Sequence, residues 1–329
     1  MEFSRKSYLE KLISAEGNSM IKIITGIRRC GKSYLLFNIF RKYLLQRGVA
    51  EKHIISLAMD DRHNKKLLDP DRLLEYIDSH VIQDGQTTYI IIDEVQMVSE
   101  FTSVLLSLIH IPNVETYVSG SNSKFLSKDV ATEFRGRGWE IRVHPLSFAE
   151  YYEGVGGEKV DAIRDYYNYG GLPAVASLPN DTAKEAYLKE LVTTIYIKDI
   201  IERNRIHNED GLQQILKVIA SNMGTTTNTN RIANTFRSVE QLAISNHTIN
   251  NYLAYLQDAF IISEAVRYDI KGRKYIGSES KYYFEDPGIR NAIIGFRQIE
   301  YTHMMENVLY NELCARGFSV DIGLIETRE

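Results

Sequence analysis

The segment at residues 26–33 carries the clearest chemistry in the sequence. It reads GIRRCGKS and matches the phosphate-loop pattern GxxxxGK[ST], the Walker A motif. In such a loop, successive backbone N–H groups leading into a helix N-terminus supply the many donors that a triphosphate needs. Gly26 and Gly31 permit tight turns and a close approach of the backbone to phosphate. Lys32 would reach the β- and γ-phosphates, and the Ser33 hydroxyl would ligate Mg²⁺.

The residues on either side of this loop support the prediction of a nucleotide site. Residues 21–25 (IKIIT) read as a strand. After the loop, apolar residues recur at helical spacing from Leu36 to Leu44, and Gly48 is a natural helix C-cap. The alternative is a chance match to the pattern, and the strand before the loop and the helix after it argue against that alternative. We expect the nucleotide to contact Gly26, Arg28, Arg29, Cys30, Gly31, Lys32, Ser33 and Tyr34.

Three residues inside the loop have two interpretations each. Arg28 and Arg29 either contact phosphate or a neighbouring acidic group, or are solvated loop arginines. Cys30 is either a redox-sensitive thiol, because nearby N–H dipoles and Lys32 would lower its pKa, or a residue that is small enough to fit.

An acidic pair predicts the other half of the nucleotide site. Residues 89–92 (YIII) are typical of a strand buried on both faces of a parallel sheet. Asp93 and Glu94 follow at its carboxyl end, where open α/β sheets bind ligands. This is a Walker B arrangement, in which Asp93 would hold Mg²⁺ through water and Glu94 would orient and deprotonate the attacking water. The sequence has no NKxD motif, which favours adenine over guanine.

A third strand is predicted over residues 114–119 (VETYVS), and it is followed by Gly120, Ser121 and Asn122. Polar side chains at this place would lie beside the γ-phosphate and could sense it. We therefore include Ser121 and Asn122 among the nucleotide-binding candidates, with an ordinary turn as the alternative.

Composition and charge limit the class of protein. The 329 residues, 44% apolar and 25% charged, are average for globular chains and suggest two domains with a third small piece. No apolar run approaches the roughly 20 residues that cross a bilayer, and charges near the amino terminus argue against a signal peptide. Two cysteines form neither a disulfide framework nor a zinc site, so we expect a cytoplasmic protein. The net charge of −4 argues against a generally basic surface for nucleic acid but leaves room for a local patch.

Six motifs in a fixed order extend the analysis beyond the loop. From residue 25 to about 206 they are TGIRRCGKS, IIIDEVQ, VSGSNS, FRGRGWEIRVHPLSFAEYY, YNYGGLP and TTIYIKDIIERNRI. With them the chain resembles the AAA-superfamily predicted ATPases of archaea and bacteria that join an ATPase module to a winged helix and a restriction-endonuclease-like carboxy-terminal domain of unknown function. The resemblance implies binding and hydrolysis of ATP.

The resemblance also implies an arginine of the RGR segment that acts as a phosphate sensor or finger. Arg137 is the matching residue, and it would act within its own chain or across a subunit boundary of a homo-oligomer. The structural alternative is that Arg135 and Arg137 pair with nearby Glu133 or Glu140.

The second half reads as helices followed by a β-hairpin. Three short helices after residue 206 and two β-rich segments joined by a basic loop make a winged helix-turn-helix, which the resemblance also covers. The third helix, residues 245–257, contains no lysine or arginine, and residues 205–285 carry nine basic against eight acidic side chains. This is a poor electrostatic footprint for DNA, so packing or a protein partner is favoured. The candidate contacts to DNA or a partner are Thr248, Asn251, Lys271, Arg273 and Lys274.

Residues 304–313 read as a further helix, and residues 318–322 alternate like a strand. The resemblance implies that this helix opens the endonuclease-like domain and that Glu306 matches its helix glutamate. The rest of a nuclease centre would lie beyond Glu329, so we expect an incomplete domain without nuclease activity.

The expected fold class is α/β, with a P-loop NTPase of the AAA type and a mostly parallel sheet flanked by helices. We expect this domain with a helical extension at residues 1–205, a winged helix at 206–290 and an incomplete domain at 291–329. The expected function is Mg²⁺-dependent ATP hydrolysis, coupled to a nucleic-acid or protein partner through the winged helix, with Lys32, Glu94 and Arg137 as the catalytic residues. The metal ligands would be Ser33 and Asp93. The alternatives are a nucleotide-gated switch that binds DNA or protein with little hydrolysis, and a scaffold with a structural nucleotide.

Overall fold

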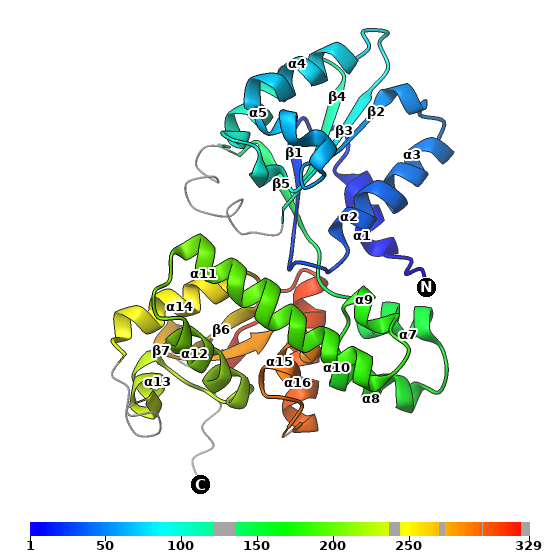
Figure 1. Ribbon diagram of the computed structural model, residues 1–329. Coiled ribbons are helices and arrows are strands. Elements are labelled where there is room, and N and C mark those ends of the chain that lie inside the picture. Colours follow the sequence, from blue (N-terminus) through cyan, green and yellow to red (C-terminus); the bar gives the residue numbers. More distant parts are fainter. Residues whose placement is uncertain (121–133, 135, 237–243, 270–273, 298, 324–329) are drawn as a thin grey trace. The chain divides into compact units, whose positions relative to one another are not determined.

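The computed structural model describes residues 1–120, 134, 136–236, 244–269, 274–297 and 299–323 (Figure 1). The chain forms two compact units. Ser4–Val143 make up one, which we call the P-loop unit, and Met1–Phe3 with His144–Glu329 make up the other, which we call the C-terminal unit. The division therefore falls before the helical extension that the sequence analysis assigned to the first domain. The boundaries expected at 205 and 290 stay predictions.

A five-stranded sheet forms the centre of the P-loop unit. Its order is β2-β3-β4-β1-β5, and every neighbouring pair is parallel. The strands are β1 (Ile21–Thr25), β2 (Ile54–Ala58), β3 (Thr88–Asp93), β4 (Val114–Ser119) and β5 (Gly138–Arg142). β1 and β3 are buried along their whole length, as expected for strands covered on both faces. The predicted α/β class with a parallel sheet is confirmed.

Helices cover both faces of this sheet (Figure 1). On one face, apolar residues of α4 (Pro70–His80) and α5 (Phe101–Leu108) share a core with alternate strand residues such as Ile90 and Ile92. On the other face, Phe40 packs against Tyr89 and Tyr117. The remaining helical segments of the unit are α1 (Lys6–Ser14), α2 (Lys32–Tyr34), η1 (Leu35–Phe40), α3 (Arg41–Gln46), η2 (Glu51–His53), η3 (Arg62–Leu68) and η4 (Val95–Met97).

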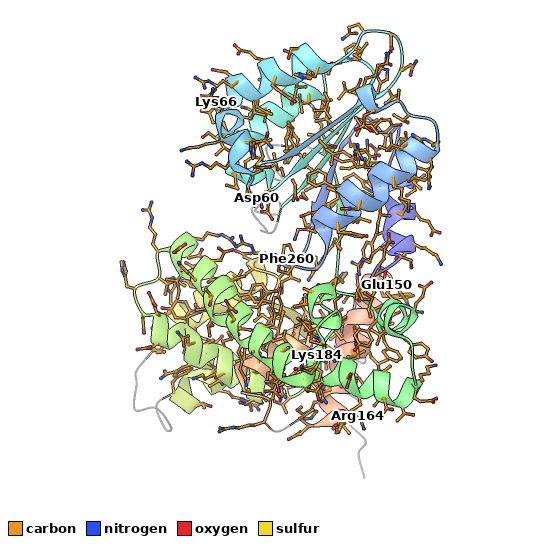
Figure 2. The ribbon with its side chains drawn as sticks, turned by 45° about the vertical axis from the view of Figure 1, so that its right-hand side comes forward. Asp60, Lys66, Glu150, Arg164, Lys184 and Phe260 are labelled. Carbon is orange, nitrogen blue, oxygen red and sulfur yellow. The ribbon has the colours of Figure 1, made fainter. Side chains whose placement is uncertain are left out.

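Because the five strands are parallel, all of their carboxyl ends lie at one edge of the sheet, which we call the carboxyl edge. Thr25, Asp93 and Ser119 are the last residues of β1, β3 and β4 and mark this edge. Asp60, labelled in Figure 2, follows the end of β2 at the same edge. The opposite edge, where the strands begin, is the amino edge.

Most elements of the C-terminal unit are helices. Its segments are α7 (Phe148–Val155), α8 (Lys159–Tyr169), α9 (Pro173–Ala176), α10 (Asp181–Glu190), η6 (Leu191–Ile197), α11 (Lys198–Asn204), α12 (Glu209–Ser221), α13 (Thr229–Thr235), α14 (Asn246–Asp258), α15 (Pro287–Ile293) and α16 (Tyr301–Ala315). Lys184 of α10, labelled in Figure 2, donates to Asp165 of α8 over 3.2 Å and joins those two helices.

The buried carboxylate of Asp286 fixes the YGGLP segment against α15. Its two oxygens accept hydrogen bonds from the backbone N–H of Gly171 (2.7 Å) and of Ile289 (3.1 Å). An added Cβ at Gly170 would lie 2.0 Å from the Asp286 carboxylate, so only glycine fits there. This motif of the resemblance thus has a packing role.

The C-terminal unit also contains a small three-stranded sheet. β6 (Ile262–Asp269) pairs antiparallel with β7 (Lys274–Phe284), Thr227 bridges to Ser280 of β7, and β8 (Ile322–Gly323) adds to β6 in parallel. The helix α16 packs on the hairpin, where the Asn307 side chain bonds both the N–H and the C=O of Phe284.

Glu306, the residue matched to a nuclease glutamate, also faces this hairpin. It accepts hydrogen bonds from Lys281 Nζ and from the Tyr283 hydroxyl, both at 2.6 Å. Although burial opposes ionisation, these bonds hold the pKa of Glu306 below its ordinary value. Among the described residues, no helix is long and apolar enough to cross a membrane.

Candidate nucleotide-binding site

The P-loop leaves β1 at the carboxyl edge and turns sharply. Gly26 has φ 138°, and an added Cβ there would lie 2.1 Å from the carbonyl oxygen of Val143. Gly31 has φ 100° and Arg29 has φ 70°, so three loop residues adopt left-handed or related backbone conformations. The backbone of the loop is therefore shaped by glycine in the way that the sequence motif requires.

Lys32 lies at the centre of the loop. Its side chain is buried, and its ammonium donates hydrogen bonds to the carbonyl oxygens of Gly26 (2.9 Å) and Ile27 (3.0 Å). The ammonium group of Lys32 therefore lies inside the curve of the P-loop. Phosphate oxygens would take the place of these carbonyl acceptors, or add to them, at the same position.

The other predicted loop residues divide into exposed and buried side chains. Arg28, Arg29, Ser33 and Tyr34 are exposed to solvent. Cys30 is fully buried, and its thiol donates to the carbonyl oxygen of Val143 over 3.3 Å. A buried and bonded thiol favours the interpretation of Cys30 as a small packing residue, which would meet phosphate only through its backbone.

Asp93 and Ser119 form a buried pair at the ends of neighbouring strands. The register of β3 and β4 pairs Ile92 with Val118, so the next residue of each strand also faces its neighbour. The Ser119 hydroxyl donates a hydrogen bond to Asp93 Oδ1, and both side chains are buried. Ser119 is not among the residues predicted from the sequence. The available signal was a polar residue at the carboxyl end of an otherwise apolar strand.

Glu94 leaves the strand in a left-handed conformation, with φ 52° and ψ 43°. Its backbone N–H lies 3.4 Å from the Ser119 hydroxyl oxygen. Its carboxylate accepts a hydrogen bond from the side-chain amide of Gln96, which is also not among the predicted residues. The half-buried Glu94 side chain is therefore held by its own turn rather than pointing freely into solvent.

Arg137 lies at the other edge of the sheet. Its carbonyl oxygen accepts a hydrogen bond from Ile21, the first residue of β1, and Gly138 pairs with Ile21 in the register of β1 and β5. The P-loop begins after Thr25, at the far end of a strand that spans roughly 13 Å. The structure does not bring Arg137 to the nucleotide site of its own chain. Of the two expected modes of action, the one across a subunit boundary remains as a proposal.

The pairing of Arg137 with Glu140 was the alternative. The Glu140 carboxylate instead accepts a hydrogen bond from the Thr25 hydroxyl at 2.6 Å. Arg135, Glu133, Ser121 and Asn122 lie outside the described residues.

The structure also locates the predicted contacts of the second half. Thr248 helps to cap α14, because its N–H and hydroxyl both bond Ser245, and Asn251 lies 3.4 Å from His247 on the same helix. Lys271 and Arg273 lie outside the described residues. Lys274 begins β7, and its side chain lies outside the described part.

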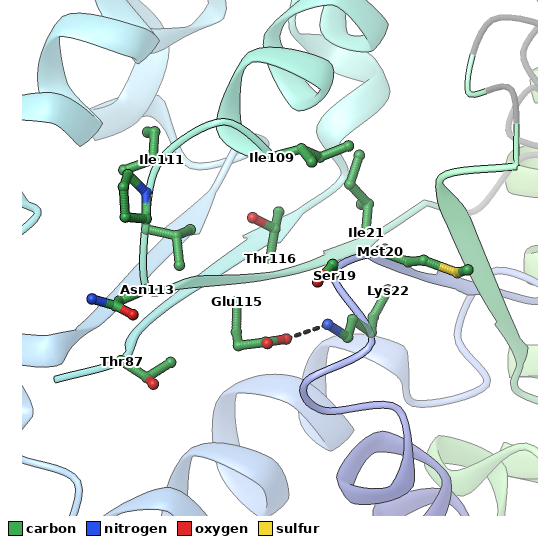
Figure 3. A pocket seen from close by; sticks show the side chains of 12 residues that line it. Ser19, Met20, Ile21, Lys22, Thr87, Ile109, Ile111, Asn113, Glu115 and Thr116 are labelled. Atoms are coloured by element: carbon green, nitrogen blue, oxygen red, sulfur yellow. Dashed lines mark hydrogen bonds and ion pairs between the residues drawn. The ribbon is translucent and has the colours of Figure 1, made fainter. Parts of the chain in front are cut away.

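A cavity of about 360 Å³ opens at the amino edge and is distinct from the nucleotide site (Figure 3). Lys22 of β1 and Glu115 of β4 form an ion pair on its wall. The Glu115 carboxylate also accepts the N–H of Gly17 over 3.1 Å. This pair ties the turn after α1 to the start of the sheet, which gives it a structural role.

The oxygen atoms at the carboxyl edge fit Mg²⁺ that is held together with nucleotide phosphates. Among the described residues, no three His, Cys, Asp or Glu side chains gather as a metal site. Mg²⁺ is usually held by one or two protein oxygens together with substrate phosphates and water. The exposed hydroxyl of Ser33 and the buried carboxylate of Asp93 can supply those oxygens.

Comparisons with known proteins agree with this geometry. Residues 18–152 match the family described as AAA domain, and residues 160–300 match a domain of unknown function, DUF8612. An uncharacterized protein of Haemophilus influenzae is 33% identical over 331 residues, which cover 99% of this chain and 82% of that protein. The chain belongs to the AAA superfamily of P-loop ATPases. Uncharacterized protein MJ1544 of Methanocaldococcus jannaschii is 27% identical over 316 residues, 91% of this chain and 67% of that protein.

Two solved structures are also similar to this chain. The Aeropyrum pernix ORC1 protein in complex with DNA is 12% identical, covers 96% of this chain and 94% of its own, and gives a TM-score of 0.35. Cdc6p from Pyrobaculum aerophilum is 10% identical, covers 92% and 94%, and gives a TM-score of 0.36. At these TM-scores the similarity carries no information on ligands or partners.

Proposed function

We propose that this ATPase binds ATP with Mg²⁺ at the carboxyl edge of the parallel sheet and hydrolyses it to ADP and phosphate. The observation that carries the proposal is the convergence of three strand ends. The P-loop follows β1, Asp93 and Glu94 lie at the end of β3, and β4 between those strands supplies Ser119 as a hydrogen-bond donor to Asp93.

Each residue has a separate role in this proposal. Lys32 would bind the β- and γ-phosphates, while Ser33 and Asp93 would hold Mg²⁺. A bound Mg²⁺ would neutralise charge on the phosphates. Glu94 orients the attacking water and accepts its proton. Phosphoryl transfer depends mainly on positioning and charge stabilisation, so an arginine such as Arg137 supplied by a second subunit would raise turnover.

We propose in addition that residues 206–290 form a winged helix that engages a protein partner. The order of α12, α13 and α14 followed by the β6–β7 hairpin supports this, as does the bridge from Thr227 to β7. Arg231 and Arg267 both pair with Glu279, at 3.0 and 3.2 Å. Because these two guanidinium groups are engaged, the surface that they occupy is poorly suited to a phosphate backbone.

Nucleotide binding and Mg²⁺-dependent release of phosphate test the proposal together. We expect ATP to bind at least about tenfold more tightly than GTP, and Lys32→Met to weaken ATP binding by at least a similar factor. Phosphate release should require Mg²⁺ and stop when EDTA is added. Failure of the wild-type chain to bind ATP would contradict the proposal, whereas tight binding without release would favour the nucleotide-gated switch.

A further inference from the structure

The side chain of Gln96 contacts the proposed general base. Gln96 lies two residues after Glu94 in the short turn η4, and its Nε2 donates a hydrogen bond to Glu94 Oε2.

The backbone that carries Gln96 is held firmly. Val95 and Val98 on either side of it are buried in the core between the sheet and α4 and α5. The N–H of Met97 bonds the carbonyl oxygen of Glu94, and the N–H of Val98 bonds that of Val95, each at 3.0 Å. Gln96 therefore presents its amide from a rigid position.

The amide group of Gln96 is not explained by packing alone. The Oε1 atom of Gln96 is buried and has no hydrogen-bond partner among the described residues. Burial of an unpaired amide oxygen is unfavourable, and an apolar side chain of similar size would avoid it. The bond from Nε2 to Glu94 is the contact that an apolar side chain could not make.

We propose that Gln96 is a positioning residue that orients the Glu94 carboxylate toward the attacking water. The inference rests on the proposed hydrolysis of ATP. Glu94 reaches the site through a flexible side chain, and small errors in the placement of a general base cause large losses of rate. A fixed amide donor reduces the number of orientations that the carboxylate can adopt.

Two near-isosteric variants test this role. Gln96→Met keeps the volume and removes the donor, and Gln96→Glu keeps the shape and places a like charge against Glu94. We expect both to lower kcat at least about tenfold while the Kd for ATP stays within about threefold. The matched control is Gln83→Met, an exposed glutamine of the same unit, which should leave kcat unchanged.

Double variants separate positioning from general destabilisation. If Gln96 acts only through Glu94, adding Gln96→Met to Glu94→Gln should lower the residual rate by less than about twofold, because residues that act as a unit are not additive. A Gln96→Met chain with wild-type kcat, a loss of ATP affinity that matches the loss of kcat, or additive effects in the double variant would overturn the inference. If Glu94→Gln alone does not lower kcat, the proposed hydrolysis with Glu94 as the general base is wrong instead.

Discussion

The hydroxyl of Ser119 donates a hydrogen bond to Oδ1 of Asp93 across two neighbouring strands, although 26 residues separate them in the chain. Both side chains are buried. A buried carboxylate loses its hydration, so a donor from β4 offsets part of that cost and fixes the orientation of the oxygens. The same bond thus contributes to the stability of the sheet edge and to the geometry of the proposed metal site.

Replacement of Ser119 by alanine should affect both properties. Without its donor, Asp93 is less well held, so we expect the free energy of unfolding to fall by about 1–3 kcal/mol and the Mg²⁺ concentration for half-maximal turnover to rise. Urea unfolding and a Mg²⁺ titration of turnover measure these changes. Ser107→Ala, on the exposed side of α5, is the control and should change stability by less than about 0.5 kcal/mol. Equal stability of the two variants would contradict the role of Ser119.

Gly26 should tolerate no side chain. A methyl group there would meet the carbonyl oxygen of Val143 at 2.1 Å, so Gly26→Ala must move the P-loop or the end of β5. We expect ATP binding to be lost and stability to fall by about 3 kcal/mol or more, measured by nucleotide titration and thermal unfolding.

Gly48→Ala is the matched control for this prediction. Gly48 also has a positive φ, 95°, but nothing lies within 4 Å of an added Cβ. Only the backbone strain remains, so we expect a loss of about 1–2 kcal/mol and normal ATP binding. ATP binding by Gly26→Ala at wild-type affinity would show that the close approach to Val143 does not shape the loop.

Asp286 should make stability depend on pH. Burial raises the pKa of Asp286 to about 7. Hydrogen bonds from the backbone N–H groups of Gly171, Ile289 and Gly288 lower the pKa and offset part of this effect. Between the ordinary value of 3.8 and about 7, the folded chain holds a proton that the unfolded chain has released. The contribution of Asp286 is therefore most favourable at acidic pH and is lost as the pH rises toward 7. Asp286→Asn should remove this part of the slope.

Urea unfolding at several values between about pH 5 and pH 8 measures that slope for the wild type and for Asp286→Asn. The exposed Asp161 of α8 provides the control, because Asp161→Asn should keep the wild-type slope. Identical slopes for Asp286→Asn and the wild type would contradict the assignment of a raised pKa to Asp286.

Arg137 should act on a neighbouring subunit. Since it lies at the amino edge of its own sheet, we expect Arg137→Ala to leave ATP binding unchanged. The specific activity of the wild type should rise with protein concentration, and that of Arg137→Ala should stay flat and low. Arg72→Ala, an exposed arginine of α4, should behave like the wild type. A wild-type activity that is independent of concentration and insensitive to Arg137→Ala would refute the prediction.

The P-loop, the parallel sheet and the pair Asp93–Glu94 were predictable because their signals are local. GIRRCGKS lies directly between a strand and a helix, and the apolar run 89–92 ends at Asp93. The edge on which Arg137 lies depends on the register of β5 beside β1, which spacing along the chain does not give.

The contacts between distant residues were not predictable, because no local pattern specifies which residues meet in the fold. Gly171 and Asp286 meet although 115 residues separate them, and nothing local to either residue specifies the other. Gln96 is closer to Glu94 in sequence, but its role depends on the turn that directs its amide back to the carboxylate. A polar residue after an acidic pair is common and carries no signal without that geometry.

Phosphate release at saturating ATP and Mg²⁺, compared between the wild type and Glu94→Gln, shows whether this protein hydrolyses ATP with Glu94 as the general base. Both chains should bind ATP with similar Kd, because Glu94 acts on water and not on the nucleotide. We expect turnover by the wild type and a loss of about 100-fold or more in the variant, the range expected for removal of a general base. Equal rates in the two chains, or no release by a wild type that binds ATP, would contradict it.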